Sequence, residues 1–154
     1  MSRRTTRPKR RPATPSAPSA PAVTAGSPCP CGLPAAYGEC CGRFHSGPAT
    51  APTAELLMRS RYSAFVVRDA GYLLRTWAPE TRPGEVDFDP SMRWAGLEIR
   101  DTADGTAFHQ SGTVTFVARY THGVEAAGSL HERSRFRRHE GAWVYVDGDF
   151  IDEP

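Results

Sequence analysis

The chain has 154 residues, enough for one modest domain with appendages, and its 23% charged and 10% aromatic residues are typical of a soluble globular protein. No apolar stretch approaches the roughly 20 residues that a transmembrane helix needs. The formal net charge of +2 conceals an asymmetry, because six of the 19 Lys and Arg residues lie within residues 1–11. The rest of the chain carries 13 basic and 17 acidic residues, a net charge of −4.

Residues 1–27 are expected to form a tail without a core. Residues 12–28 are rich in Pro, Ala and Ser, which predicts an extended or disordered segment. Clustered arginines attract phosphate, so one interpretation is a weak contact with nucleic acid or the ribosome. No aromatic residue is interleaved for base stacking, which favours a solvated basic terminus instead. Because no apolar segment follows the basic start, we expect no secretory signal and a cytoplasmic location.

All four cysteines lie in the stretch C-P-C-G-L-P-A-A-Y-G-E-C-C-G, residues 29–42. Cys29 and Cys31 are separated by one residue, and Cys40 and Cys41 are adjacent. Four thiols suffice for one tetrahedral metal site. Thiolates suit zinc, cuprous copper or iron–sulfur clusters, and a compact four-sulfur set favours zinc among these.

The competing interpretation of the cysteines is a pair of disulfides. Neighbours such as Cys40 and Cys41 seldom bridge each other without strain, and a reducing cytosol disfavours disulfides. Four thiolates close the coordination shell and make the ion a poor Lewis acid, so we expect a structural Zn²⁺. His45 lies close enough in sequence to compete for the fourth position, but the simpler interpretation is an exposed loop histidine.

The cysteine stretch resembles the SEC-C motif, a small zinc-binding element also found at the carboxyl end of the translocase ATPase SecA. The resemblance rests on C-P-C-G at 29–32, on Tyr37 and on C-C-G at 40–42, and it implies a zinc element over residues 28–47. SEC-C motifs usually carry a second glycine and lysines between the cysteine pairs. Here those positions hold Pro34, Ala35, Ala36, Gly38 and Glu39. We therefore expect the same metal ligands and a different surface for partners.

Residues 48–154 are expected to form a second domain in which two helices precede four strands. Thr53 predicts the N-cap of an amphipathic helix whose apolar residues run to Val66, with Ser63 on the outward face. Asp69 is expected to cap a shorter helix that stops before Pro79. The period then changes to two, which predicts antiparallel strands near 94–102, 113–121, 129–138 and 143–146.

Helices followed by an antiparallel meander predict an α+β layer, with the helices on one face of a curved sheet. This order resembles the YchJ family of bacterial proteins over residues 28 to about 150. The motifs that carry the resemblance are S-R-Y-S-A-F near 60, W-A-G-L-E-I near 94, H-E-R-S-R-F near 131 and W-V-Y-V-D-G near 143. It implies a cone-shaped domain like that of nuclear transport factor two, ketosteroid isomerases and SnoaL-like cyclases, and it implies no particular activity.

A cone of this kind encloses a pocket between its sheet and its helices, and such pockets are default ligand sites. Glu132 is the one charged residue on its face of the third strand, so pointing inward it would be a candidate general base. The alternative is an ion pair with Arg59, Arg61 or Arg133. The candidate pocket residues are Glu132, Ser134, Phe136, Tyr62, Trp77 and Trp143, although the spacing of the aromatic residues also fits core packing.

Two functions remain open from the sequence. The first is an interaction protein whose zinc element presents a rigid loop to another protein or to ribosome-associated machinery. The second is an isomerase-, cyclase- or hydrolase-type enzyme that uses Glu132 as base. No glycine-rich phosphate loop or nucleophile motif occurs in the sequence. We favour the first function because its chemistry is a complete ligand set, whereas the second depends on one carboxylate.

Overall fold

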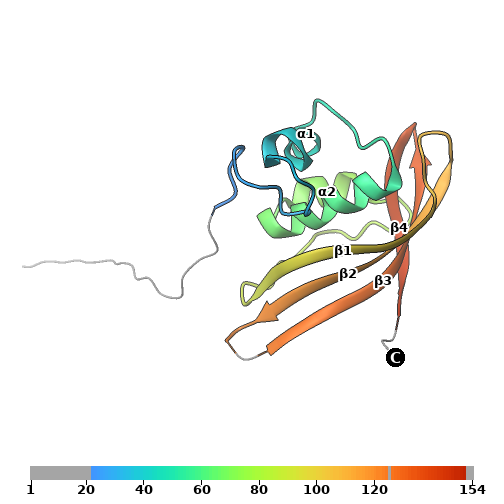
Figure 1. The fold of residues 1–154 in the computed structure, drawn as a ribbon. Helices are drawn as coiled ribbons and strands as arrows, with labels where there is room; N and C mark the ends of the chain where they lie inside the picture. The colour runs from blue at the N-terminus through green and yellow to red at the C-terminus, as the bar shows by residue number, and fades with distance from the viewer. Residues whose placement is uncertain (1–21, 125, 152–154) are drawn as a thin grey trace, which may run out of the picture.

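The computed structural model describes residues 22–124 and 126–151 (Figure 1). The cysteine-rich stretch contains a 3-10 turn, η3 (Tyr37–Glu39), and a short helix, α1 (Cys41–His45). The helices α2 (Ala54–Val67) and α3 (Ala70–Arg75) come next. The strands are β1 (Met92–Asp104), β2 (Ser111–His122), β3 (Ala126–His139) and β4 (Ala142–Phe150). The predicted α+β order, helices before strands, is confirmed. No helix among the described residues has both the length and the apolar character needed to cross a membrane.

Both predicted helix caps are present. Thr53 Oγ1 accepts a hydrogen bond from Leu56 N at 3.1 Å, and Asp69 Oδ1 accepts one from Tyr72 N at 3.0 Å. Arg68, at φ 62°, adopts the left-handed conformation that ends α2. The two caps therefore set the start of α2 and of α3, and the short connection between them leaves the helices in contact.

Helix α2 is buried on two sides, which differs from the predicted amphipathic pattern. Its apolar side packs on the sheet, but Ser60 and Ser63 are also fully buried. Ser63 was expected to face solvent; instead it lies under the cysteine stretch. Small hydroxyl side chains leave room for a second layer to approach the helix.

The four strands form one antiparallel sheet in the order β1-β2-β3-β4. The sheet curves, and α2 crosses its concave side (Figure 1). Irregularities in the register occur near Trp94 and Ile99 in β1, and in β4 opposite Arg135 and Phe136, where β4 has one extra residue. Such bulges bend a strand and increase its twist. The curvature leaves space between the sheet and α2, and this space contains the pocket described below.

One hydrophobic core joins the cysteine stretch to the sheet. It includes Phe44 of α1, Leu57 of α2, Leu73 of α3 and Phe116 and Phe136 of the sheet. The segments 28–47 and 48–154, expected as separate domains, therefore pack together through a shared core.

The tail predicted over residues 1–27 falls largely on residues 1–21, which lie outside the described residues. Its end is structured. Ser27 N donates to Thr24 O at 3.0 Å, and Gly38 N donates to Ala25 O at 2.9 Å. Residues 24–27 thus form a turn that is attached to η3, where the composition predicted an extended chain.

Candidate metal centre and pocket

The four cysteine side chains form one buried cluster. Their Sγ atoms all lie within 4.8 Å of one another, and those of Cys31 and Cys40 are 3.7 Å apart. None of the four residues is more than 5% exposed, and all four are free thiols. A tetrahedral site with Zn–S distances of about 2.3 Å has edges of about 3.8 Å. The sulfur atoms therefore have a spacing that fits a soft divalent ion such as Zn²⁺.

Two turns bring the cysteine pairs together. Cys29 N donates to Ala35 O at 3.0 Å, and Gly32 N donates to Cys29 O at 3.2 Å. Gly32 has φ 94°, which glycine adopts without a steric penalty. The second pair lies where η3 passes into α1, and Cys40 N donates to Tyr37 O at 3.0 Å. The backbone thus positions all four sulfurs through local hydrogen bonds.

Without a metal, the thiols of Cys29, Cys40 and Cys41 differ in pKa. Hydrogen bonds from Cys31 and Cys41 lower the pKa of the Cys29 thiol. Burial raises the pKa of Cys40 to about 12, and the hydrogen bond to Cys29 is the main cause of the raised pKa of Cys41. Cys29 therefore favours the thiolate, whereas Cys40 and Cys41 favour the protonated thiol. A cation that binds here must displace those protons, as expected for a thiolate metal site.

Side chains of helix α2 contact the cysteine cluster. Arg59 Nη1 donates to Cys31 O at 2.8 Å, and Arg59 Nε pairs with Glu55 at 2.9 Å. Ser63 Oγ lies 3.8 Å from Cys29 Sγ. These contacts form an outer layer of hydrogen bonds around the ligands, of the kind that orients metal-binding side chains.

His45 connects the cysteine stretch to α2 instead of competing for the metal. Its Nε2 donates to Ser60 O at 2.8 Å, and its Nδ1 accepts from the Tyr37 hydroxyl at 2.6 Å. Burial lowers the pKa of the ring, which favours this neutral form. The ring also packs against Tyr72, with centroids 4.6 Å apart. The interpretation of His45 as an exposed loop residue is therefore wrong; it is half-buried and both of its nitrogens are engaged.

A pocket of about 260 Å³ lies between α2 and the concave face of the sheet. Four of the six predicted residues line it, namely Tyr62, Trp77, Glu132 and Ser134. The remaining lining residues come from α2 and from all four strands: Met58, Arg61, Phe65, Trp94, Phe116, Ala118, Leu130 and Tyr145. The strand face predicted to point inward does so.

The other two predicted residues lie outside this pocket. Phe136 is buried in the packed core, with its ring centroid 5.8 Å from that of Tyr145. Trp143 lines a different depression and donates Nε1 to Pro52 O at 3.1 Å. Both residues belong to the buried core cluster and not to the lining of the pocket between α2 and the sheet.

Glu132 is held by hydroxyl groups. Its Oε2 accepts from Ser134 Oγ at 2.7 Å and from the Tyr145 hydroxyl at 3.2 Å. The carboxylate lies against Gly148, where a Cβ atom would overlap it. The expected ion pair with Arg59, Arg61 or Arg133 is not among the contacts within 4.0 Å in residues 22–124 and 126–151. Arg59 instead contacts the cysteine loop, and Arg61 contacts α3.

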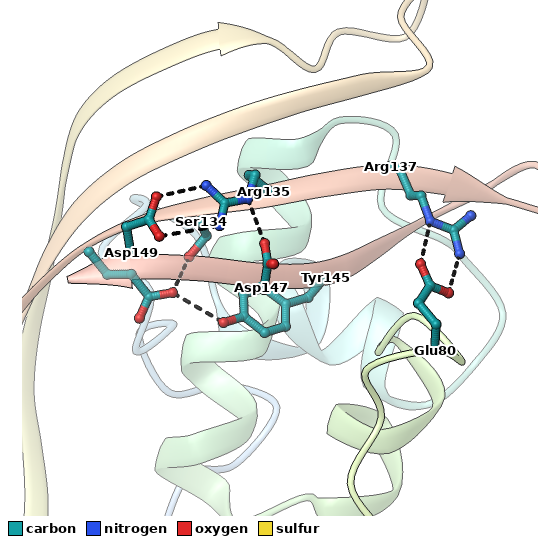
Figure 2. Close-up of polar contacts among 8 residues, drawn as sticks. Glu80, Ser134, Arg135, Arg137, Tyr145, Asp147 and Asp149 are labelled. Carbon is teal, nitrogen blue, oxygen red and sulfur yellow. Dashed lines mark hydrogen bonds and ion pairs between the residues drawn. The ribbon is translucent and has the colours of Figure 1, made fainter.

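The opposite face of β3 and β4 carries exposed ion pairs. Arg135 pairs with Asp147 at 2.6 Å and with Asp149 at 2.7 Å, and Arg137 pairs with Glu80 at 2.6 Å (Figure 2). Exposed pairs of this kind contribute little to stability. The outer face of β3 and β4 is therefore charged, whereas the other face of the same strands lines the pocket.

Arg61 and Tyr145 are pocket residues that the sequence did not single out as such. Arg61 lies four residues after the buried Leu57 and four before Phe65, so it falls on the helix stripe that packs inward. A charged residue on an otherwise apolar stripe is the signal that could have identified it. For Tyr145, the alternation of the short last strand was too brief to assign a face.

Comparisons with known proteins agree with this architecture. A family model described as the YchJ middle NTF2-like domain matches residues 53–148. A UPF0225 protein of Streptomyces coelicolor is 67% identical over 125 residues, which cover 81% of this chain and 97% of that protein. A UPF0225 protein of Corynebacterium glutamicum is 52% identical over 124 residues, covering 80% of this chain and 98% of the relative.

Two solved structures are also similar. A SEC-C motif containing protein from Rhodopseudomonas palustris has a TM-score of 0.70 and 32% identity, and the match covers 80% of this chain and 98% of that one. A SEC-C motif containing protein from Psychrobacter arcticus has a TM-score of 0.67 and 26% identity, covering 84% and 86% of the two chains.

Proposed function

Because this chain belongs to the YchJ family of UPF0225 proteins, with a SEC-C motif ahead of an NTF2-like domain, we propose that it binds one structural Zn²⁺ and uses the metal-held loop to contact a protein partner. The ligands would be Cys29, Cys31, Cys40 and Cys41. The observation that carries the proposal is the burial of four sulfurs at coordination spacing.

The composition of the loop supports a structural ion. Among residues 22–124 and 126–151, only Leu33 and Tyr37 add hydrophobic packing to the four cysteines, so the loop has little core of its own. Metal binding can contribute on the order of 10 kcal/mol to the folding of such an element. Four sulfur ligands leave no position open for water or substrate, so the ion would crosslink two turns instead of activating a reactant.

The tip of the loop is the surface that we assign to a partner. Gly32, Pro34 and Ala35 are exposed there, and the tip carries no basic side chain. A neutral tip favours a neutral protein surface as the partner over an acidic protein or a nucleic acid. The rigid backbone of a metal-held loop lowers the entropy lost on binding.

The test uses the full chain. Elemental analysis of freshly purified protein should return one zinc ion per chain, and Cys40→Ser should lose it. Ala35→Asp changes the exposed tip, and Ala107→Asp, in the exposed β1–β2 loop, is the matched control. Native cytosol should yield a partner with the wild type and with Ala107→Asp, and should yield none with Ala35→Asp or Cys40→Ser. A zinc-free wild type contradicts the metal assignment, and equal capture by all four proteins contradicts the partner assignment.

The alternative function is an isomerase- or hydrolase-type enzyme with Glu132 as base. The pocket supports ligand binding, but both hydroxyl donors use the same carboxylate oxygen and hold Glu132 as a hydrogen-bond acceptor. Glu132→Gln separates the two roles, because a base is lost and the side-chain shape is kept. If the variant still binds the ligand and the wild type does not turn it over, the pocket is a binding site and the enzyme assignment is wrong.

A further inference from the structure

Arg61 is a buried cation whose guanidinium is held by hydrogen bonds from one of its nitrogens, Nη1. It is 4% exposed, and its Nη1 donates to Leu73 O at 2.8 Å and to Thr76 Oγ1 at 2.7 Å. Its guanidinium lies over the rings of Trp77 and Tyr145, 4.8 Å and 4.7 Å from the two ring centroids. These contacts hold the side chain between α2, α3 and β4.

The charge of Arg61 has no close counter-ion. Within the described parts of the chain, no carboxylate oxygen lies within 4.0 Å of its nitrogens. Glu132 lines the same pocket and acts on Arg61 only through space. Burial lowers the pKa of Arg61 to about 10, which reflects the cost of removing the cation from water. Buried charges in proteins are ordinarily paired, so this cation is an incomplete site.

Donor groups remain available beside it. Nε and Nη2 of Arg61 have no hydrogen-bond partner among the described residues. The indole ring of Trp77 forms part of the same pocket wall, and its Nε1 is buried without an acceptor in the described part of the chain. Buried N–H groups that lack an acceptor are rare and costly. Two side chains of one wall thus offer N–H donors that the protein itself does not use.

The other walls limit the rest of the ligand. Six of the lining residues are aromatic: Tyr62, Phe65, Trp77, Trp94, Phe116 and Tyr145. Glu132 adds an acceptor to this lining, held by Ser134 and Tyr145. The volume of about 260 Å³ equals that of about nine waters in the liquid, which suits a ligand of roughly ten non-hydrogen atoms.

We propose that this pocket binds a small planar carboxylic acid. The carboxylate of the ligand accepts hydrogen bonds from Arg61 and Trp77, its flat apolar body lies among the aromatic rings, and a hydroxyl at its far end donates a hydrogen bond to Glu132. Arg61 is the residue that selects the anion. Glu132 selects among acids by accepting a hydrogen bond from the far end of the ligand. The proposal goes beyond the role of the cysteine cluster and does not depend on it.

The experiment titrates the full chain with four probes: benzoate, 4-hydroxybenzoate, hexanoate and the neutral amide benzamide. Binding is followed by the indole N–H resonances in ¹H–¹⁵N spectra, because the chain has three Trp residues. Trp77 and Trp94 line the pocket, whereas Trp143 is bonded to Pro52 elsewhere. Trp→Phe variants assign the three signals, and the Trp143 signal reports any general change.

We expect benzoate and 4-hydroxybenzoate to move the Trp77 signal and to leave the Trp143 signal in place. Hexanoate, which has no planar body to lie among the rings, should bind more weakly than benzoate, and benzamide should be at least about tenfold weaker than benzoate. Arg61→Gln should lose that preference, while Arg100→Gln, on the exposed part of β1, should keep it. Glu132→Gln should still bind benzoate and should lose the preference for 4-hydroxybenzoate.

Failure is defined on the wild type, so it does not depend on whether Arg61→Gln folds. If none of the three acids moves the Trp77 signal at millimolar concentration, the pocket is not an acid site. Equal affinity for benzoate and benzamide also overturns the assignment of Arg61. Either result leaves the zinc content and partner capture of the wild type unchanged, so the two proposals fail separately.

Discussion

Ser63 Oγ of α2 lies 3.8 Å from Cys29 Sγ, so the helix that covers the pocket also touches the cysteine cluster. On its other side α2 carries Arg61 and Tyr62 into the pocket. One helix of 14 residues therefore separates the two candidate sites. Helix α3 also contacts both sites, because Tyr72 packs against His45 and the Leu73 carbonyl accepts from Arg61.

Enlarging Ser63 should loosen the cysteine loop. Ser63→Leu places a larger side chain against Cys29 in a space that is fully buried, and overpacking of this kind costs about 1–3 kcal/mol. We expect a lower free energy of unfolding and faster loss of zinc to a chelator. Ser63→Ala is the matched control and should retain zinc at nearly the wild-type rate. Equal rates for both variants would show that the contact does not support the loop.

Removal of the metal should affect the cysteine stretch first. With little hydrophobic packing of its own, residues 29–45 should lose protection against amide hydrogen exchange when a chelator extracts the ion. The sheet should keep most of its protection, because its long ladders and most of the core lie in residues 54–150. Unchanged exchange in residues 29–45 would mean that the ion contributes nothing to the fold.

His45→Phe tests the assignment of His45 as a connector and not a ligand. The substitution keeps the ring packing on Tyr72 but leaves the Ser60 carbonyl and the Tyr37 hydroxyl without their partner, a loss of about 1–3 kcal/mol. Denaturant unfolding measures this loss. Zinc content should stay at one ion per chain. A variant with less zinc would instead place His45 in the coordination shell.

Gly148→Ala should disturb Glu132. The new Cβ atom overlaps the carboxylate, so the side chain must leave its hydrogen bonds to Ser134 and Tyr145, at a cost of about 1–3 kcal/mol. In a Glu132→Ala background the same change should cost less, because the overlapping group is absent. A double-mutant cycle in denaturant gives this coupling. Additive effects of the two substitutions would exclude the contact.

Local features of the sequence determined most of the elements. Thr53 and Asp69 cap the two helices, because the hydroxyl or carboxylate oxygen of each side chain accepts a hydrogen bond from the N–H three residues later. This signal needs no distant partner. Strand alternation likewise predicted that Glu132 and Ser134 face the pocket, because side chains of a strand alternate between its two faces. The spacing of the four cysteines identified the set that meets in the cluster.

Only the tertiary structure decided how these elements share their surfaces. Ser63 became buried and His45 became a connector because the cysteine loop folds back over α2, a contact between residues far apart in sequence. Arg61 lies in the pocket, and within the part of the chain that the structure describes its contacts come from α3 and β4 and not from an acid. Periodicity indicates which face of an element a residue occupies, but the layer that covers that face depends on long-range packing.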